Sequence, residues 1–182
     1  MKVIDANISG IKIIEPRIFK DDRGFFFESF NKVRYKDAGI DADFVQDNIS
    51  GSAKGTLRGF HYQVGKFAQG KLCQVIHGKA LDVAVDIRFG SPTFGKYFSI
   101  EISDENKKQI WIPPGFAHGF AALSEFVIFS YKCTAVYDKE SERAIIYNDS
   151  EIGIDWGIEN PILSEKDLEG KKLSEIEKDF IF

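Results

Sequence analysis

The chain has 182 residues, enough for one globular domain and little more. Hydrophobic residues make up 43% of it and charged residues 29%, which excludes an intrinsically disordered chain and predicts a packed core. The formal net charge is −4 and the lysines and arginines are scattered along the sequence, so binding to DNA or RNA is not expected.

The sequence gives no sign of a membrane or secretory segment. It contains no apolar run of about 18 residues, which a membrane-spanning helix would need. Residues 1–10 include Lys2, Asp5 and Asn7, where a signal peptide would be apolar. We therefore expect a cytoplasmic protein without a membrane partner. Cys73 and Cys133 lie in apolar runs and are expected to be reduced packing residues.

The N-terminal part of the chain predicts edge strands and one short helix. Residues 2–19 are rich in β-branched side chains and contain Pro16, which indicates an edge strand or a strand that reaches a partner subunit. Asn31 is a suitable N-cap for a short helix that continues to Gly39.

The middle of the chain predicts a series of short strands. Residues 71–88 form two alternating runs on either side of Gly78 and Lys79, which is typical of a β-hairpin. In the second run Leu81, Val83 and Val85 share one face. Similar runs follow at residues 96–103, 108–113, 126–137 and 143–148.

These elements predict a single all-β domain that spans residues 1–182. Short strands at spacings of about 8 to 15 residues are typical of a sandwich or barrel. Aromatic residues reach 14%, most of them Phe, which agrees with sheets packed face to face. The segment from Ser164 to Asp167 resembles a capping box that opens a C-terminal helical turn, so the few helices are expected to be short and peripheral.

Two of the three histidines lie in dense polar segments. His61 belongs to LRGFHYQ at residues 57–63, and His118 belongs to WIPPGFAHGF at residues 111–120. The spacing Pro-x-Gly-x-x-His at residues 113–118 resembles the second motif of the cupin superfamily, whose fold is a jelly-roll barrel. His77 ends a predicted strand beside a glycine and is expected to be structural.

The first cupin motif is incomplete as a metal site. Metal-binding cupins carry a His-x-His pair there, and in this chain the second position is Gln63. The resemblance therefore implies no resident metal. A metal held by the two histidines and a distant carboxylate stays open as an alternative.

A longer series of motifs resembles the dTDP-4-dehydrorhamnose 3,5-epimerase family. The resemblance covers roughly residues 15–167 and follows the family's order along the chain. Its motifs are FKDDRGFFFES (19–29), FVQDNISGS (44–52), LRGFHYQ (57–63), QGKL (69–72), DVAVDIR (82–88), SPTFG (91–95), WIPPGFAHGF (111–120), YKCTAVY (131–137) and LSEKD (163–167).

The resemblance implies catalysis by proton transfer. In this family dTDP-4-dehydro-6-deoxy-D-glucose is converted to dTDP-4-dehydro-L-rhamnose without a cofactor. The C4 ketone acidifies the hydrogens on C3 and C5, so the reaction needs a base, a group that stabilises an enolate, and a proton donor on the opposite ring face. The implied catalytic residues are His61 as the base, Asp167 as its orienting carboxylate, Lys71 near the C4 oxygen and Tyr131 as the proton donor.

The resemblance also implies a dTDP-sugar site that two subunits of a homodimer share. Arg58 matches the diphosphate ligand, because a guanidinium can bind a phosphate through two hydrogen bonds. The other implied substrate-binding residues are His118 near the C4 oxygen, Gln46, Asn48 and Tyr137 near the nucleotide, and Arg23, Phe26 and Glu28, which the N-terminal strands of the partner subunit would contribute.

Other interpretations stay open. Asp167 could act only as the third residue of a capping box, and Tyr131 only as a core aromatic residue. The chain could invert a single carbon of a related 4-keto sugar nucleotide, act as a metal-dependent cupin enzyme, or bind a sugar without catalysis. Many relatives carry an aromatic residue where this chain has Val136, so stacking on the nucleotide base is expected to differ in detail.

Overall fold

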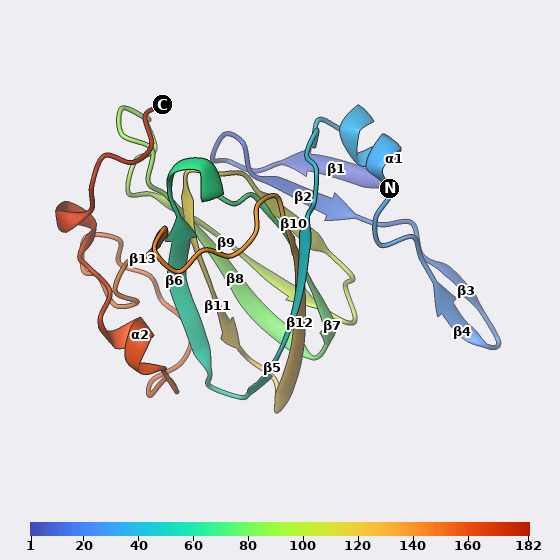
Figure 1. The fold of residues 1–182 in the computed structure, drawn as a ribbon. Helices are drawn as coiled ribbons and strands as arrows, with labels where there is room; N and C mark the ends of the chain where they lie inside the picture. Colours follow the sequence, from blue (N-terminus) through green and yellow to red (C-terminus); the bar gives the residue numbers. More distant parts are fainter.

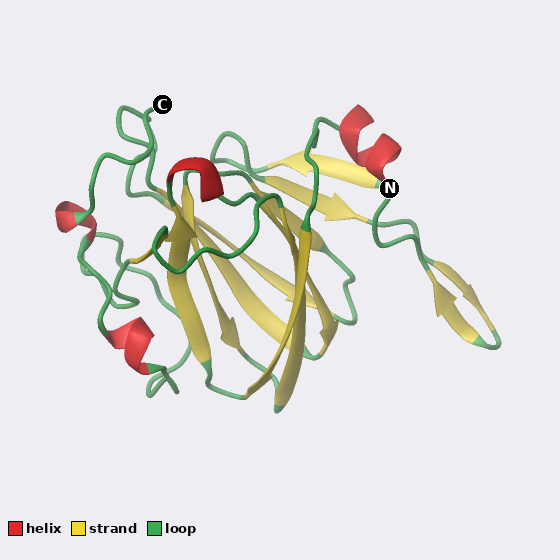
Figure 2. Ribbon diagram, in the orientation of Figure 1, coloured by secondary structure: helices red, strands yellow, loops and turns green.

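The computed structural model describes residues 1–182 and confirms the all-β prediction. Two antiparallel sheets face each other and form a cupin-type jelly-roll barrel (Figures 1 and 2). The first sheet has the order β1 (Lys2–Asp5), β2 (Lys12–Glu15), β10 (Gln109–Ile112), β7 (Lys71–His77), β12 (Phe126–Cys133) and β5 (Gln46–Ala53). The second has the order β13 (Glu142–Ala144), β6 (Leu57–Gln63), β11 (Phe116–Ala122), β8 (Lys79–Asp86) and β9 (Tyr97–Ser103).

The helical elements are short and lie outside the two sheets, as Figure 2 shows. They are α1 (Lys32–Asp37), α2 (Glu165–Leu168) and the 3-10 turns η1 (Gly65–Phe67) and η2 (Leu173–Glu175). The capping predictions are confirmed: Asn31 Oδ1 accepts from the Arg34 N–H at 3.2 Å, and Ser164 with Asp167 forms a capping box at the start of α2. No helix combines the length and the hydropathy that crossing a membrane would require.

A separate hairpin, β3 (Phe19–Asp21) and β4 (Gly24–Phe26), projects away from the barrel (Figure 1). Its aromatic side chains are exposed, with 50% of Phe19, 56% of Phe25 and 70% of Phe26 accessible to solvent. The preceding strands β1 and β2 lie at the edge of the first sheet, as the sequence predicted. The hairpin therefore offers apolar surface that this chain does not bury.

Strand β8 is buried on both faces. Val83 and Val85 belong to a cluster between the second sheet and the C-terminal segment, whereas Ala80 and Ala84 face the barrel interior. The alternation predicted for this strand is present, but its bulkier apolar face points out of the barrel. The opposite face, which carries Asp82, belongs to the barrel interior.

The C-terminal segment forms a second core on the outside of the second sheet. Ile145, Ile152, Trp156, Leu173 and Ile176 are buried against this sheet. The predicted strand at residues 143–148 is shorter than expected. Ile145 still exchanges backbone hydrogen bonds with Phe60 of β6, but from Ile146 the chain turns away and bonds to Lys171 instead.

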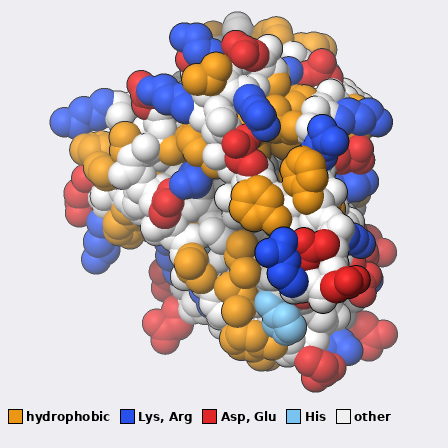
Figure 3. All heavy atoms as spheres, turned by 90° about the vertical axis from the view of Figure 1, so that its right-hand side faces the viewer, with side chains coloured by type: hydrophobic (Ala, Val, Ile, Leu, Met, Phe, Trp, Pro, Cys, Tyr) orange, Lys and Arg blue, Asp and Glu red, His pale blue; other side chains and the backbone are white.

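The outer face of the first sheet is covered only in part. Residues around α1 cover one end of it, where Tyr35 and Ile40 pack on Trp111. Further along β5, β7 and β12 the apolar side chains of Ile49, Ile76 and Phe126 are 74%, 48% and 46% exposed. Figure 3 views the molecule from this side and shows hydrophobic side chains grouped among charged ones. We call the surface of β5, β7 and β12 around these three residues the outer sheet face.

The barrel interior is expected to dominate stability. Ile110, in the middle of the first sheet, is fully buried, whereas Val33 on α1 is 68% exposed. Ile110→Ala should lower the free energy of unfolding by about 2–5 kcal/mol through lost burial and the cavity left behind. Val33→Ala should change it by less than about 0.5 kcal/mol. Urea unfolding followed by circular dichroism measures both, and equal effects would contradict this location of the core.

Candidate active site

A cavity of about 500 Å³ opens between the two sheets. Side chains of β5, β6, β7, β11, β12, β13 and α2 line it, so its wall comes from residues spread over most of the chain. It brings together predicted site residues that lie far apart in the sequence: Gln46, Asn48, Arg58, His61, Lys71, His118, Tyr131, Tyr137 and Asp167.

His61 and Asp167 form a close pair in this cavity. Nε2 of His61 lies 2.9 Å from Oδ1 of Asp167, a distance at which the two form an ion pair when the ring is protonated. The His61 side chain is 25% exposed and the Asp167 side chain 3%. The imidazole thus reaches the cavity while its carboxylate partner is shielded from water.

The carboxylate of Asp167 is held by several donors. Its Oδ1 accepts from the Gly59 N–H at 3.1 Å, and its Oδ2 accepts from the Ser164 N–H at 3.0 Å and from the Ser164 hydroxyl at 2.6 Å. Burial alone would raise the pKa of Asp167, but these hydrogen bonds and the contact with His61 hold the pKa well below its ordinary value. Asp167 therefore caps α2 and faces His61 at the same time, as an anion at neutral pH.

The two site histidines are neighbours across a strand pair. His61 in β6 lies directly opposite His118 in β11, and the register shifts just after this pair. Gly59 and Gly119 allow the strands to approach here, because a Cβ on Gly59 would lie 2.4 Å from the Gly119 Cα. The glycines therefore help to place both imidazoles in the barrel.

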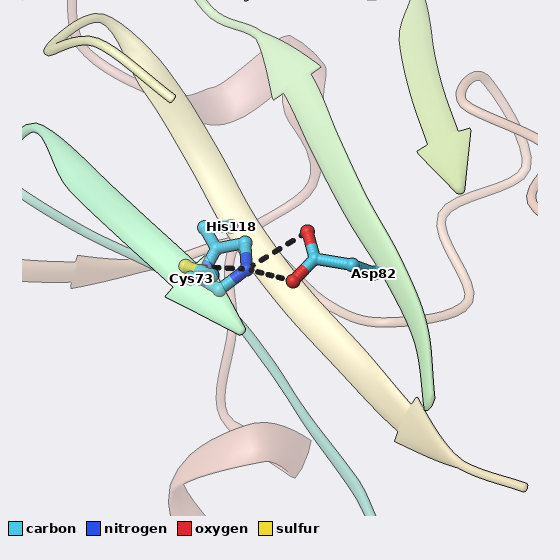
Figure 4. Close-up of side chains that lie close together, drawn as sticks. All are labelled: Cys73, Asp82 and His118. Atoms are coloured by element: carbon cyan, nitrogen blue, oxygen red, sulfur yellow. Dashed lines mark hydrogen bonds and ion pairs between the residues drawn. The ribbon is translucent and has the colours of Figure 1, made fainter. Parts of the chain in front are cut away.

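His118 lies at the end of a buried polar cluster (Figure 4). Its Nε2 is 3.0 Å from Oδ2 and 3.1 Å from Oδ1 of Asp82, and 3.9 Å from Sγ of Cys73. Burial lowers the pKa of His118, although Asp82 opposes the shift, so the ring is neutral near neutral pH. Asp82 was not among the predicted site residues, although it is the first residue of the motif DVAVDIR and shares a face of β8 with small alanines.

Lys71 and Tyr131 bring a cation and a phenol to the same cavity. Lys71 is 8% exposed, pairs with no carboxylate, and places its Nζ 5.9 Å from the centre of the Tyr131 ring. Lys71 thus starts β7 inside the barrel rather than on the surface. Burial raises the pKa of Tyr131 to about 12, and its hydroxyl has no hydrogen-bond partner within the chain. The phenol is therefore a protonated donor that is free to bind a ligand.

The mouth of the cavity carries the residues predicted to bind a nucleotide. Arg58 donates from Nε to the Ser52 hydroxyl at 3.1 Å and from Nη2 to the Gly51 carbonyl at 3.3 Å. The Tyr137 N–H donates to Oε1 of Gln46 at 2.8 Å, and the Tyr137 ring is 53% exposed. These contacts hold the guanidinium of Arg58 and the aromatic ring of Tyr137 at the entrance.

Three further residues that were not assigned to the substrate site also line this wall. Glu142 accepts from the Tyr137 hydroxyl at 3.0 Å and pairs with Lys166, so both line the entrance. Gln63, which stands where metal cupins have a ligand, donates to the Val136 carbonyl at 3.1 Å and accepts from the Asp138 N–H at 2.8 Å. Gln63 thus holds the loop that carries Tyr137. Gln63 and Lys166 lie inside the motifs LRGFHYQ and LSEKD, whereas nothing in the sequence around Glu142 marked a site.

Three predicted residues lie outside this cavity. Arg23 and Phe26 belong to the projecting hairpin, where Arg23 pairs with Asp21 at 2.6 Å and Phe26 is exposed. Glu28 follows the hairpin and pairs with Arg34 at 3.1 Å. Within one chain these residues do not reach the histidines, as expected if they serve a partner subunit.

The low pKa of Asp167 has a consequence for stability. A carboxylate whose pKa is lower in the folded than in the unfolded state stabilises the fold above the unfolded value of about 3.9, and this contribution is lost as the pH falls further. Asp167→Asn should therefore destabilise the protein most near neutral pH, and its difference from wild type should shrink between about pH 5 and pH 2. Urea unfolding across this range measures the difference, and parallel pH curves would contradict it.

Comparisons with known proteins agree with this geometry. A family model described as dTDP-4-dehydrorhamnose 3,5-epimerase matches residues 5–175. The dTDP-4-dehydrorhamnose 3,5-epimerase of Shigella flexneri is 51% identical over 173 residues, which cover 94% of this chain and 96% of the relative. A Legionella pneumophila dTDP-6-deoxy-D-glucose-3,5-epimerase, solved with dTDP-4-keto-L-rhamnose, matches with a TM-score of 0.93 and 52% identity over 97% of this chain and 94% of that chain. A 3'-monoepimerase from Streptomyces bikiniensis, solved with dTDP-quinovose, matches with a TM-score of 0.87 and 32% identity over 93% and 86% of the two chains. The chain therefore belongs to the dTDP-4-dehydrorhamnose 3,5-epimerase family, whose members are isomerases.

Proposed function

We propose that this enzyme converts dTDP-4-dehydro-6-deoxy-D-glucose to dTDP-4-dehydro-L-rhamnose by inverting C3 and C5. The observation that carries the proposal is the His61–Asp167 pair in one cavity with an unpartnered phenol, that of Tyr131. This arrangement supplies a base and an acid to one substrate. The high identity to named 3,5-epimerases supports the same reaction.

His61 is the proposed base. Its imidazole takes the proton from C3 or C5, and the electron pair of the broken C–H bond moves into the C4 ketone to form an enolate. Because Asp167 stays ionised, it stabilises the imidazolium that results and keeps the ring oriented toward the cavity. The pair therefore lowers the barrier to proton removal.

Lys71 and His118 are the residues proposed to lie near the C4 oxygen. A buried ammonium without a carboxylate partner favours a developing negative charge, because little water competes for it. His118 would lie beside Lys71 without donating to the oxygen, because its neutral ring has one N–H, on Nε2, and donates it to Asp82. The enolate would thus form against groups that are already in place.

Tyr131 is the proposed proton donor on the opposite ring face. A phenol whose pKa is raised to about 12 is protonated at neutral pH, and it becomes a strong base once the proton is given up. Solvent then returns its proton between turnovers. Inversion results when the carbon loses a proton to His61 and regains one from Tyr131.

The entrance is the proposed nucleotide site. Arg58 would bind the diphosphate through its guanidinium, and Tyr137 would offer a stacking surface to the thymine. Gln46 accepts from the Tyr137 N–H and donates to Asn48, so both residues belong to the same part of the wall as Tyr137. Val136, which is 49% exposed, leaves the base with one aromatic neighbour fewer than many relatives provide.

A homodimer is proposed to complete this site. Arg23, Phe26 and Glu28 are too far from the cavity to serve it in one chain, but the hairpin projects where a second subunit could receive it (Figure 1). The outer sheet face supplies unburied apolar surface for such a contact. A cytoplasmic location is also proposed, in keeping with two free cysteines.

A single-carbon epimerase is the second candidate, because the Streptomyces bikiniensis 3'-monoepimerase shares the fold at 32% identity. Proton NMR of the dTDP-4-keto sugar in D2O separates the two candidates. We expect deuterium at both C3 and C5 and a product inverted at both, with His61→Ala slower by more than about 100-fold. Inversion of C3 alone would support the second candidate, and the absence of exchange would contradict both.

Tyr131→Phe tests the division between base and acid. His61 should still remove a ring proton and return deuterium, whereas inversion should fall about 100-fold because the opposite face has lost its donor. C5 is expected to be affected most, because water can substitute at C3. The readouts are the exchange and inversion rates from the same NMR experiment. Equal losses of both rates, with an unchanged circular dichroism spectrum, would return Tyr131 to a packing role.

The oligomeric state tests the shared site. Light scattering at micromolar concentration should give twice the mass of one chain. Ile49→Lys and Ile76→Lys, which place charges on the outer sheet face, should shift the protein toward monomers and lower its activity. Ile181→Lys is the matched control, since Ile181 is as exposed as Ile49 but lies near the C-terminus. A fully active monomer would contradict the proposal.

A further inference from the structure

We propose that Cys73, Asp82 and His118 form a site for a thiophilic divalent cation such as Zn²⁺. No step of the proposed reaction uses Cys73. Inhibition of the enzyme by such an ion rests on the proposed function, whereas the binding itself does not.

The geometry of the three side chains fits a zinc site. Their ligand atoms lie within 4.8 Å of one another, with Sγ of Cys73 at 3.9 Å and Oδ2 of Asp82 at 3.0 Å from Nε2 of His118. Tetrahedral zinc, with bonds of about 2.3 Å to sulfur and about 2.0–2.2 Å to nitrogen or oxygen, places its ligands about 3.3–3.6 Å apart. The distances from Nε2 to Sγ and to Oδ2 would therefore have to change by only a few tenths of an ångström to admit the ion. The distance between Sγ and the carboxylate would have to shorten by more.

The ligands are held by the fold rather than by flexible loops. Cys73 lies on β7 in one sheet, and Asp82 and His118 lie on β8 and β11 in the other, so the three converge across the barrel interior (Figure 4). Cys73 and Asp82 are fully buried, and 6% of His118 is exposed. His118 also lines the cavity, which gives an ion a route from solvent.

The chemistry of the three donors selects the metal. Sulfur, nitrogen and one carboxylate together favour Zn²⁺ over Mg²⁺ or Ca²⁺, which prefer oxygen ligands alone. Binding forms bonds from the metal to Sγ, Nε2 and a carboxylate oxygen. The thiol proton leaves to solvent, and the ring proton moves from Nε2 to Nδ1. The Lys71 ammonium is close enough to repel a metal ion at this site. The bond from the metal to the Cys73 thiolate therefore has to offset this repulsion, which favours a thiophilic ion.

An ion at this site would inhibit the enzyme. It would occupy Nε2 of His118 in place of Asp82 and repel the nearby Lys71 ammonium, so that Lys71 would be displaced from the position proposed for the C4 oxygen. The ring could then no longer contribute its present hydrogen bond with Asp82 to the preorganised site. Inhibition by Zn²⁺ should be reversed by a chelator.

The test uses Co²⁺ as a spectroscopic probe on chelator-treated protein. Wild type should bind one Co²⁺ per chain and show a thiolate-to-cobalt charge-transfer band, which Zn²⁺ then displaces. Cys73→Val, of similar size, should lose the band and bind the metal more than about tenfold more weakly. Cys133→Val is the matched control, because Cys133 is the other fully buried cysteine and lies on the neighbouring β12, so the band should persist.

The outcomes separate this site from the proposed function. Absence of the band in wild type, or its loss in Cys133→Val but not in Cys73→Val, would overturn the site. Cys73→Ser serves as a second variant if Cys73→Val does not fold. In the activity assay, Zn²⁺ should slow wild type more than tenfold but should not slow Cys73→Val relative to its own metal-free rate. If wild type has no epimerase activity, the Co²⁺ spectrum still decides whether the site exists.

Discussion

The Asp167 carboxylate joins the two parts of the molecule on which the site depends. It accepts hydrogen bonds from Gly59 in β6 and from Ser164 at the start of α2, and it lies against His61. The orientation of the imidazole therefore depends on the docking of the C-terminal segment onto the barrel. A single buried anion thus connects the stability of the fold with the chemistry of the cavity.

The sequence predicted the helix starts and the hairpin turn, because each depends on side chains within a few residues along the chain. Asn31 and Ser164 cap helices through their own side chains, and Gly78 takes the positive φ of +81° that its hairpin turn requires. The cavity has no such local cause, because its wall comes from seven elements. Only the resemblance of ordered motifs gathered these residues. The hydrophobic pattern could not have predicted that Lys71 is buried, because the residues next to it in the sequence do not show that its side chain enters the cavity.

Strand β8 shows why alternation could not place the remaining partners. Both faces of this strand are buried, one in the barrel and one under the C-terminal segment, so hydrophobicity does not tell which face is inside. Asp82 was therefore not recognised as the partner of His118. Glu142 and Lys166 were missed for a related reason: each is an ordinary surface charge until a remote segment brings the two together.

The second core also sets an order of events during synthesis. The barrel strands leave the ribosome first, and the outer face of the second sheet, which includes Leu57, Val83 and Val85, stays uncovered until residues 145–176 follow. An incomplete chain therefore displays a hydrophobic surface of the kind that chaperones and proteases recognise. The same chain lacks the partner of His61. The segment that covers this hydrophobic surface is thus the same one that brings the Asp167 carboxylate to His61.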